Sequence, residues 1–151
     1  MIKIYMTKYQ ILKDFNTSLI DIENILGTDE ITTNVQLYRL GNILFGNRFK
    51  GVFTADAKFK LKNNEMCIIN TDPSNKKGMH WFSIFKYKNR KYFYDSFARD
   101  YKSLSPYFKN KKWFNVKNNV DESFAGKDCG QLSMTFLVVF DKYKLKVLNV
   151  I

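Results

Sequence analysis

The chain has 151 residues, which is enough for one domain with a substantial core and too few for two. Hydrophobic residues make up 45% and aromatic residues 17%, with only 2 prolines and 7 glycines, so the composition excludes a disordered or low-complexity protein. Lysine and arginine number 25 against 14 acidic residues, for a net charge of +11. This excess attracts polyanions such as nucleic acid, or it reflects a lysine-rich composition that only keeps the protein soluble.

Cysteine usage and apolar runs restrict the environment of the protein. Cys67 and Cys129 cannot build a disulfide framework, and neither lies in a Cys-x-x-Cys motif or a His/Cys cluster, so we expect no metal site. Residues 1–8 lack the apolar core of a signal peptide, and no apolar run approaches the roughly 20 residues that span a bilayer. The sequence predicts a soluble, intracellular protein in a reducing compartment, monomeric by default and without a membrane partner.

Two helices are predicted in the first third of the chain. Residues 17–26 place apolar side chains at helical spacing after a capping hydroxyl, and Gly27 provides a stop signal. A second helix is predicted from Thr32 or Thr33 through Leu44. Both helices are amphipathic, so each has one face for a core.

The middle of the chain is typical of strands. Residues 65–70 form a continuous apolar run that predicts a buried strand. Residues 71–78 are polar and include proline and glycine, which predicts a loop. Residues 80–87 and 91–97 are rich in aromatic side chains and are joined by a short polar segment, which predicts an antiparallel hairpin. One more strand is predicted around residues 113–116, within a basic, asparagine-rich stretch.

The last third of the chain begins its apolar run at Gly130. This run is too apolar for a surface helix, so it predicts a central buried helix with Cys129 at its N-terminus. We expect one domain over residues 1–151, with residues 1–30 as an N-terminal helical extension.

The single histidine, His80, is followed along the chain by Asp95 and then by Cys129. A cysteine attacks as the thiolate, and a helix N-terminus and a nearby imidazolium both favour that form. A carboxylate that fixes the tautomer of the histidine completes such a site. Each residue alone has a plainer reading, as a core cysteine, a structural histidine or a turn aspartate. Together they favour a thiol nucleophile, a histidine base and an orienting aspartate.

The register of the predicted hairpin decides whether His80 meets Asp95. If the turn is centred between Tyr87 and Lys88, the two residues lie directly opposite each other on one face. If the turn is centred on residues 89–90, Asp95 lies four positions away from the partner of His80, and contact needs a bulge or a wide turn.

Five short motifs accompany these residues over about residues 45–140. They are Phe49-Lys-Gly-Val-Phe53, Met66-Cys-Ile-Ile-Asn-Thr71, Gly78-Met-His-Trp-Phe82, Tyr94-Asp-Ser-Phe97 and Asp128-Cys-Gly130. With these motifs the chain resembles the adenovirus-type maturation proteases, the adenain-like cysteine endopeptidases, including their relatives in virophages and Maverick-type elements.

The resemblance implies a fold and an activity. The fold would be a papain-related α+β cysteine-protease domain of permuted order, with a mixed β-sheet packed against a central buried helix that bears the nucleophile. His80 would be the base, Asp95 would orient it, Cys129 would be the nucleophile and Trp81 would shield the imidazole. The activity would be cleavage of viral capsid and structural precursors during virion maturation, after small residues such as glycine, in the virion and in the host cytoplasm or virus factory.

One departure from this family concerns the oxyanion hole. The family supplies a glutamine six or seven positions before the cysteine, where this chain has Ser123 and Glu122. Ser123, a protonated Glu122, or Asn118 or Asn119 on a folded-back loop are the alternative side-chain donors, beside the backbone N–H of Cys129. Loss of one such donor costs about 10²- to 10³-fold in rate.

The family also uses DNA and a viral peptide, linked through a cysteine, as cofactors. The sequence itself requires no cofactor, and Cys67 lies in a buried apolar strand that argues against such a link. Stimulation by DNA is compatible with the basic stretch from Lys86 to Lys117, for which we expect weak, salt-sensitive, sequence-independent binding. The residues expected to carry this binding are Lys88, Arg90, Lys91, Lys109, Lys111 and Lys112.

Two other functions remain open from the sequence. Proteases of ubiquitin-like modifiers share the order of histidine, aspartate and Cys-Gly, although the chain length, the Asn70-Thr71 match and the basic charge favour the viral class. The non-enzymatic alternative is a basic DNA-binding or packaging protein on the same fold, with an oxyanion site weakened by Glu122 and Ser123.

Overall fold

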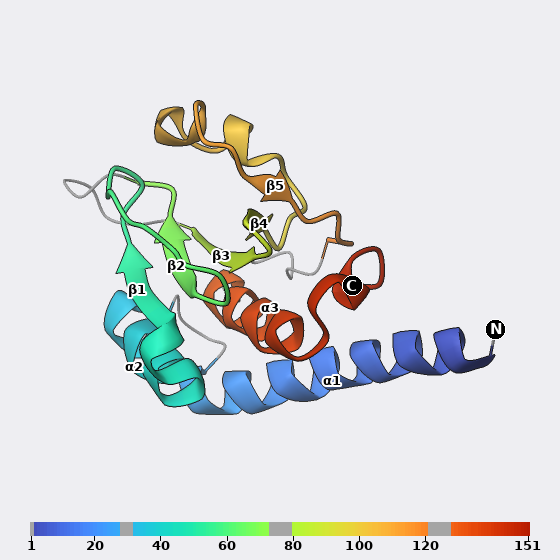
Figure 1. The fold of residues 1–151 in the computed structure, drawn as a ribbon. Coiled ribbons are helices and arrows are strands. Elements are labelled where there is room, and N and C mark those ends of the chain that lie inside the picture. Colours follow the sequence, from blue (N-terminus) through green and yellow to red (C-terminus); the bar gives the residue numbers. More distant parts are fainter. Residues whose placement is uncertain (1, 28–31, 73–79, 121–127) are drawn as a thin grey trace.

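The computed structural model of the chain describes residues 2–27, 32–72, 80–120 and 128–151, and these form an α+β fold (Figure 1). A five-stranded mixed sheet has the order β1 (Phe49–Phe53), β2 (Met66–Asn70), β3 (Trp81–Tyr87), β4 (Arg90–Tyr94) and β5 (Phe114–Asn115). The outer pairs are parallel and the two inner pairs are antiparallel. The helices are α1 (Ile2–Leu26), α2 (Asn34–Phe45) and α3 (Cys129–Tyr143).

Helix α3 is the centre of the fold. It lies between the sheet and α1, and its side chains are buried from Cys129 through Leu137 (Figure 1). Aromatic rings join it to the sheet, with Tyr94 stacked on Phe136 at 4.7 Å between centroids. The prediction of a central buried helix that starts at Cys129 is therefore confirmed.

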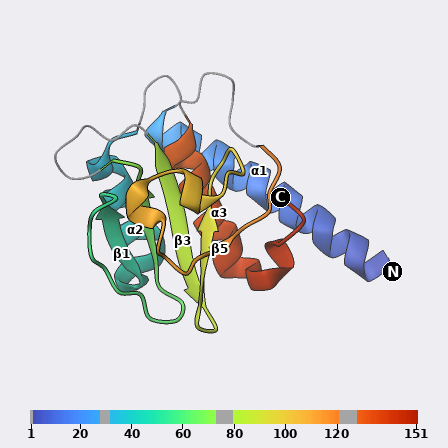
Figure 2. The same cartoon turned by 90° about the horizontal axis from the view of Figure 1, so that it is seen from above.

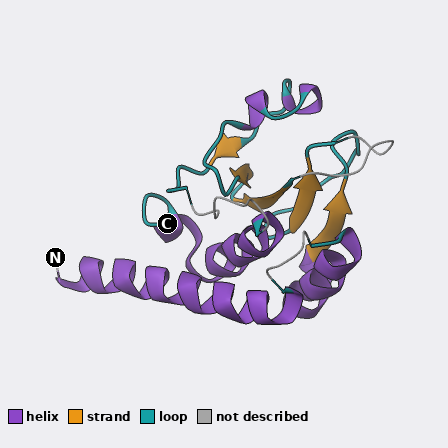
Figure 3. Cartoon of the chain, turned by 180° about the vertical axis from the view of Figure 1, so that it is seen from behind, coloured by secondary structure: helices purple, strands orange, loops and turns teal. Residues whose placement is uncertain are grey.

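Helix α1 is much longer than predicted, since it begins at Ile2 rather than near residue 17. It ends as expected at Gly27, whose φ of +84° suits a residue without a side chain. Its inner face contributes Ile11, Phe15 and Ile22 to the main core against α3, so the helical pattern extends well before residue 17. The first turns of α1 run out beyond the rest of the molecule (Figure 3).

Helix α2 starts where the sequence predicts. The side chain of Thr33 accepts a hydrogen bond from the backbone of Gln36, and the Gln36 side chain accepts one from the backbone of Thr33, which is a capping box. Gly41 within this helix has a packing reason, because a Cβ there would lie 2.4 Å from the ring of Phe49 on β1. The absence of a side chain therefore lets α2 approach the edge of the sheet.

The face of the sheet that points away from α3 has its own apolar layer. Two short 3-10 turns, Tyr101–Ser103 and Pro106–Phe108, fold the chain back over this face before it returns as β5. Stacking of Trp113 on Phe93, at 5.5 Å between centroids, closes the layer. The strands predicted at 65–70, 80–87, 91–97 and 113–116 are present, while the predicted loop 71–78 lies mostly outside the described residues. Within the described ranges no helix is long and apolar enough to cross a membrane.

We expect Gly41→Ala to lower the free energy of unfolding by about 1–3 kcal/mol, because the added methyl group overpacks the buried contact with Phe49. Urea denaturation measures this loss, with the exposed Asn42→Ala on the same helix as control. Alanine otherwise stabilises a helix relative to glycine by about 1 kcal/mol, so a gain in stability in Gly41→Ala would contradict the close approach of α2 and β1.

Candidate functional site

Three residues singled out by the sequence come to one end of the sheet. His80 directly precedes β3, Asp95 directly follows β4, and Cys129 is the first residue of α3. Strand β3 and helix α3 start at the same end and run in the same direction (Figure 2).

The start of α3 is anchored on the residue that follows His80. The Ser133 hydroxyl donates to the carbonyl of Trp81 at 3.1 Å, and a Cβ on Gly130 would lie 3.2 Å from the Trp81 ring. These contacts hold the N-terminus of α3, with Cys129, beside the strand end that carries His80.

The hairpin register differs from both predicted alternatives. Its turn residues are Lys88 and Asn89, with φ of +48° and +65°, so Tyr87 pairs with Arg90. Two consecutive residues with positive φ are typical of a type I′ turn, which matches the twist of the flanking strands. Continued beyond the strands, this register sets Asp95 diagonally across from His80 on the same face.

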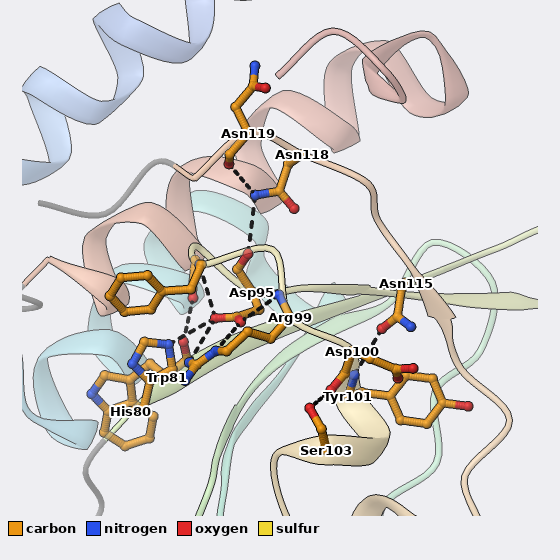
Figure 4. A network of polar contacts seen from close by, with 12 residues as sticks. His80, Trp81, Asp95, Arg99, Asp100, Tyr101, Ser103, Asn115, Asn118 and Asn119 are labelled. Carbon is orange, nitrogen blue, oxygen red and sulfur yellow. Dashed lines mark hydrogen bonds and ion pairs between the residues drawn. The ribbon is translucent and has the colours of Figure 1, made fainter.

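The diagonal position brings the two side chains into contact. His80 Nε2 lies 3.0 Å from Asp95 Oδ1, as Figure 4 shows from close by. The Asp95 side chain is fully buried and that of His80 is 13% exposed. Since an ionised carboxylate can only accept, Nε2 carries the proton of this hydrogen bond. In the neutral ring Nδ1 is then the basic nitrogen.

Asp95 holds further hydrogen bonds that sequence reasoning missed. Arg99 donates from Nε to Oδ2 at 2.7 Å, from its backbone N–H to Oδ2 at 3.0 Å and from Nη2 to Oδ1 at 3.3 Å. The backbone N–H of Phe97 donates to Oδ1 at 3.3 Å. An aspartate that accepts from the backbone two residues later is a familiar turn arrangement, but the side-chain contact of Arg99 needs the folded loop.

These contacts control the ionisation of Asp95. Burial alone raises the pKa of the carboxyl, but hydrogen bonds from His80 and Arg99 and the guanidinium charge outweigh burial and lower the pKa to about 2. Asp95 is therefore a carboxylate at every pH at which the protein would work.

The environment of Trp81 differs from the role that the resemblance implies. Neighbouring residues of a strand point to opposite faces, and the Trp81 indole donates from Nε1 to the carbonyl of Thr32 at 3.0 Å. The rings of Phe82 and Phe97 pack against the imidazole instead, at 4.7 and 5.7 Å between centroids. We therefore assign the cover of the imidazole to these phenylalanines and assign Trp81 to the junction of β3 with α3.

The predicted oxyanion donors have different outcomes. Glu122 and Ser123 lie outside the described residues. Asn118 does not serve as predicted, because its side-chain amide donates to the carbonyls of Asp95 at 3.2 Å and Asn119 at 2.7 Å (Figure 4). One of these two hydrogen bonds supports the turn at Asp95, and the other is local to Asn118 and Asn119. The backbone N–H of Cys129 lies in the first turn of α3, where N–H groups have no partner within the helix.

The two cysteines are both free and both buried, in different settings. Cys129 is 1% exposed and stands at the N-terminus of α3, where the helix dipole favours an anion. Cys67 lies in the middle of β2, where burial raises the pKa of its thiol. Cys67 is thus an apolar core residue, as its strand position predicts.

The cationic residues of the basic stretch do not form one patch. Lys86 pairs with Lys91 across β3 and β4, and burial, followed by the charges of Lys86 and Lys111, lowers the pKa of Lys91. Lys88 and Arg90 lie over the rings of Tyr87 and Phe114, which border the α3 face of the sheet. Of the predicted DNA-binding residues, Lys88 and Arg90 therefore lie on the α3 face of the sheet, and Lys91, with Lys111 near it, lies on the opposite face.

Comparison with protein-family models finds no match, and comparison with curated proteins finds none either. Any assignment of function therefore rests on the residues, their geometry and the motif resemblance.

The depressed pKa of Asp95 predicts a loss of stability in acid. The folded protein binds this proton less readily than the unfolded chain, whose ordinary pKa is 3.8, so the contribution is complete above that value and is lost as the pH falls through about 2. Its size is about 2 kcal/mol. Urea unfolding between roughly pH 6 and pH 2, a range that spans ordinary carboxyl pKa values, measures this contribution to the free energy of unfolding. In Asp95→Asn the acid slope should flatten, whereas the exposed Asp21→Asn should keep it; equal slopes in the wild type and Asp95→Asn would contradict the assignment.

Proposed function

We propose that this chain is a cysteine endopeptidase in which Cys129 is the nucleophile, His80 is the base and Asp95 orients the base. The observation that carries the proposal is the 3.0 Å hydrogen bond between His80 Nε2 and the buried Asp95 carboxylate, at the sheet end where α3 begins with Cys129. The Asp95 bond leaves Nδ1 as the nitrogen that can accept a thiol proton.

The chemistry follows from these roles. His80 Nδ1 takes the proton of the Cys129 thiol, and the thiolate sulfur forms a bond to the carbonyl carbon of the substrate peptide. The developing oxyanion accepts a hydrogen bond from the Cys129 backbone N–H. When the C–N bond breaks, the leaving amine takes the proton from the imidazolium. Water, deprotonated by the same nitrogen, then hydrolyses the thioester and restores the thiol.

The burial of Cys129 adds a requirement. A thiol that is 1% exposed is out of reach of a peptide carbonyl, so substrate binding has to displace part of its cover. Substrate-driven uncovering of a nucleophile is a known form of induced fit.

The substrate class rests on the motif resemblance. We propose viral capsid and structural precursors cleaved after small residues, because the His80-Trp81, Tyr94-Asp-Ser-Phe97 and Asp128-Cys-Gly130 motifs occur in the order of the adenain-like proteases. A protease of ubiquitin-like modifiers is the alternative enzyme. Cleavage of a capsid-precursor peptide in preference to a ubiquitin-like fusion protein separates the two.

We expect iodoacetamide to alkylate Cys129 slowly, because the residue is 1% exposed, yet faster than Cys67, because Cys129 stands at a helix N-terminus beside the strand end that carries His80. Mass spectrometry after timed quenching measures both rates in one sample, with the deeply buried Cys67 as internal control. The Cys129 rate should collapse in His80→Ala. A Cys129 rate that is the same in the wild type and in His80→Ala would refute the proposed activation.

A non-enzymatic function as a basic DNA-binding protein has one observation of its own. Lys86 and Lys91 stand directly opposite each other with Lys111 close to Lys91, and like charges at such positions repel in the absence of an anion. A phosphate backbone relieves this repulsion. The same contacts would let DNA act as a cofactor of the peptidase.

We expect duplex DNA to bind weakly and with a steep dependence on salt, as measured by fluorescence anisotropy of a labelled duplex over a salt series. Lys91→Gln and Lys111→Gln should each reduce the slope of log affinity against log salt by roughly one. Lys60→Gln, which removes an exposed lysine before β2, should change the slope less. Absence of binding at low salt would remove DNA as a partner.

A further inference from the structure

Arg99 forms hydrogen bonds with the Asp95 carboxylate, which is also bonded to His80. Its guanidinium reaches both oxygens of Asp95, from Nε to Oδ2 at 2.7 Å and from Nη2 to Oδ1 at 3.3 Å, which is a forked contact. Asp95 is fully buried while the Arg99 side chain is 43% exposed. A cation thus caps the buried pair from the solvent side.

Two further contacts hold Arg99 in place. Its guanidinium lies over the ring of Phe97 at 5.0 Å, and that ring stacks on the imidazole of His80. The chain that follows Arg99 is fixed because the Tyr101 backbone N–H donates to Asn115 Oδ1 at 3.0 Å (Figure 4). Arg99, Phe97 and His80 therefore form a layered group around one carboxylate.

The charge of Arg99 matters for the histidine. A lone buried carboxylate strongly favours the imidazolium form of its partner. With a guanidinium on the same carboxylate, the net charge that faces His80 is close to zero, so the neutral ring is favoured. A neutral ring is the form that can accept a proton from a thiol.

We propose that Arg99 is a positioning residue that acts through Asp95. It holds Oδ1 toward His80 Nε2 and offsets the carboxylate charge, so that the histidine remains a neutral base near neutral pH. The catalytic meaning of this assignment rests on the proposed peptidase function. The effect on the histidine itself does not.

Other titratable groups stand at this end of the sheet. Asp72 lies just after β2, next to Thr71, whose backbone N–H donates to the carbonyl of His80. Asp128 precedes Cys129 at the start of α3. Asp128 faces Glu23 of α1, since burial and then the charge of Asp128 raise the pKa of Glu23. Asp72 and Asp128 are acidic, whereas Arg99 is a cation bonded directly to Asp95, so its removal changes the net charge on the carboxylate that His80 contacts.

The single histidine makes a direct test simple, because the imidazole signals of the chain in NMR spectra belong to His80. We expect Arg99→Gln to raise the titration midpoint of these signals by about one pH unit, the size of effect that one nearby charge has. Arg99→Lys keeps the charge and loses the fork, so its midpoint should stay near that of the wild type. Lys102→Gln removes an exposed cation from the same loop as control.

The outcomes separate this inference from the proposed function. An unchanged midpoint in Arg99→Gln, with a normal thermal unfolding curve, overturns the inference even if the protein cleaves peptides. A raised midpoint without any cleavage supports the role of Arg99 and counts against the peptidase. If cleavage occurs, the acid limb of kcat/KM should move to higher pH in Arg99→Gln, whereas a purely structural defect would lower activity at all pH values.

Discussion

The packing of α3 between the sheet and α1 is the constraint on which the other features depend. The helix is apolar on nearly every side, so it can be stable only where both its faces are covered. Tyr94 and Phe136 on one side, and Ile11 and Phe15 on the other, provide that cover. Because α3 cannot shift without opening this core, its first residue, Cys129, has a fixed place relative to β3. The location of the candidate nucleophile is therefore a consequence of core packing.

Electrostatic compensation is the second constraint. A buried carboxylate destabilises a fold unless it is bonded and paired, and Asp95 is bonded by His80, Arg99 and two backbone N–H groups. The same contacts that allow Asp95 to be buried also fix the tautomer of His80. Stability and the proposed chemistry thus depend on one group of hydrogen bonds. The Asn118 side-chain amide adds a hydrogen bond to the backbone carbonyl of Asp95.

The excess of positive charge has a different distribution from the one that a basic stretch suggests. Arg90 and Lys91 are adjacent in β4 and point to opposite faces, so cations that are close in sequence fall into two separate groups in space. One group borders the aromatic rings on the α3 face, and the other gathers Lys86, Lys91 and Lys111. Such an arrangement favours a diffuse attraction for polyanions over a shaped groove.

The sequence by itself determined the elements whose signals are local. The capping box at Thr33, the buried strand at 65–70 and the apolar helix from Cys129 follow from nearby residues, and so do the identities of His80, Asp95 and Cys129. Only the tertiary structure decided the rest. The hairpin register depends on positive φ at Lys88 and Asn89, which composition does not specify, and it sets the diagonal contact of His80 with Asp95. Three features require a partner distant in sequence or a folded loop: the length of α1, the direction of the Trp81 side chain and the hydrogen bonds from Arg99 to Asp95. Only the closed core brings these partners within reach.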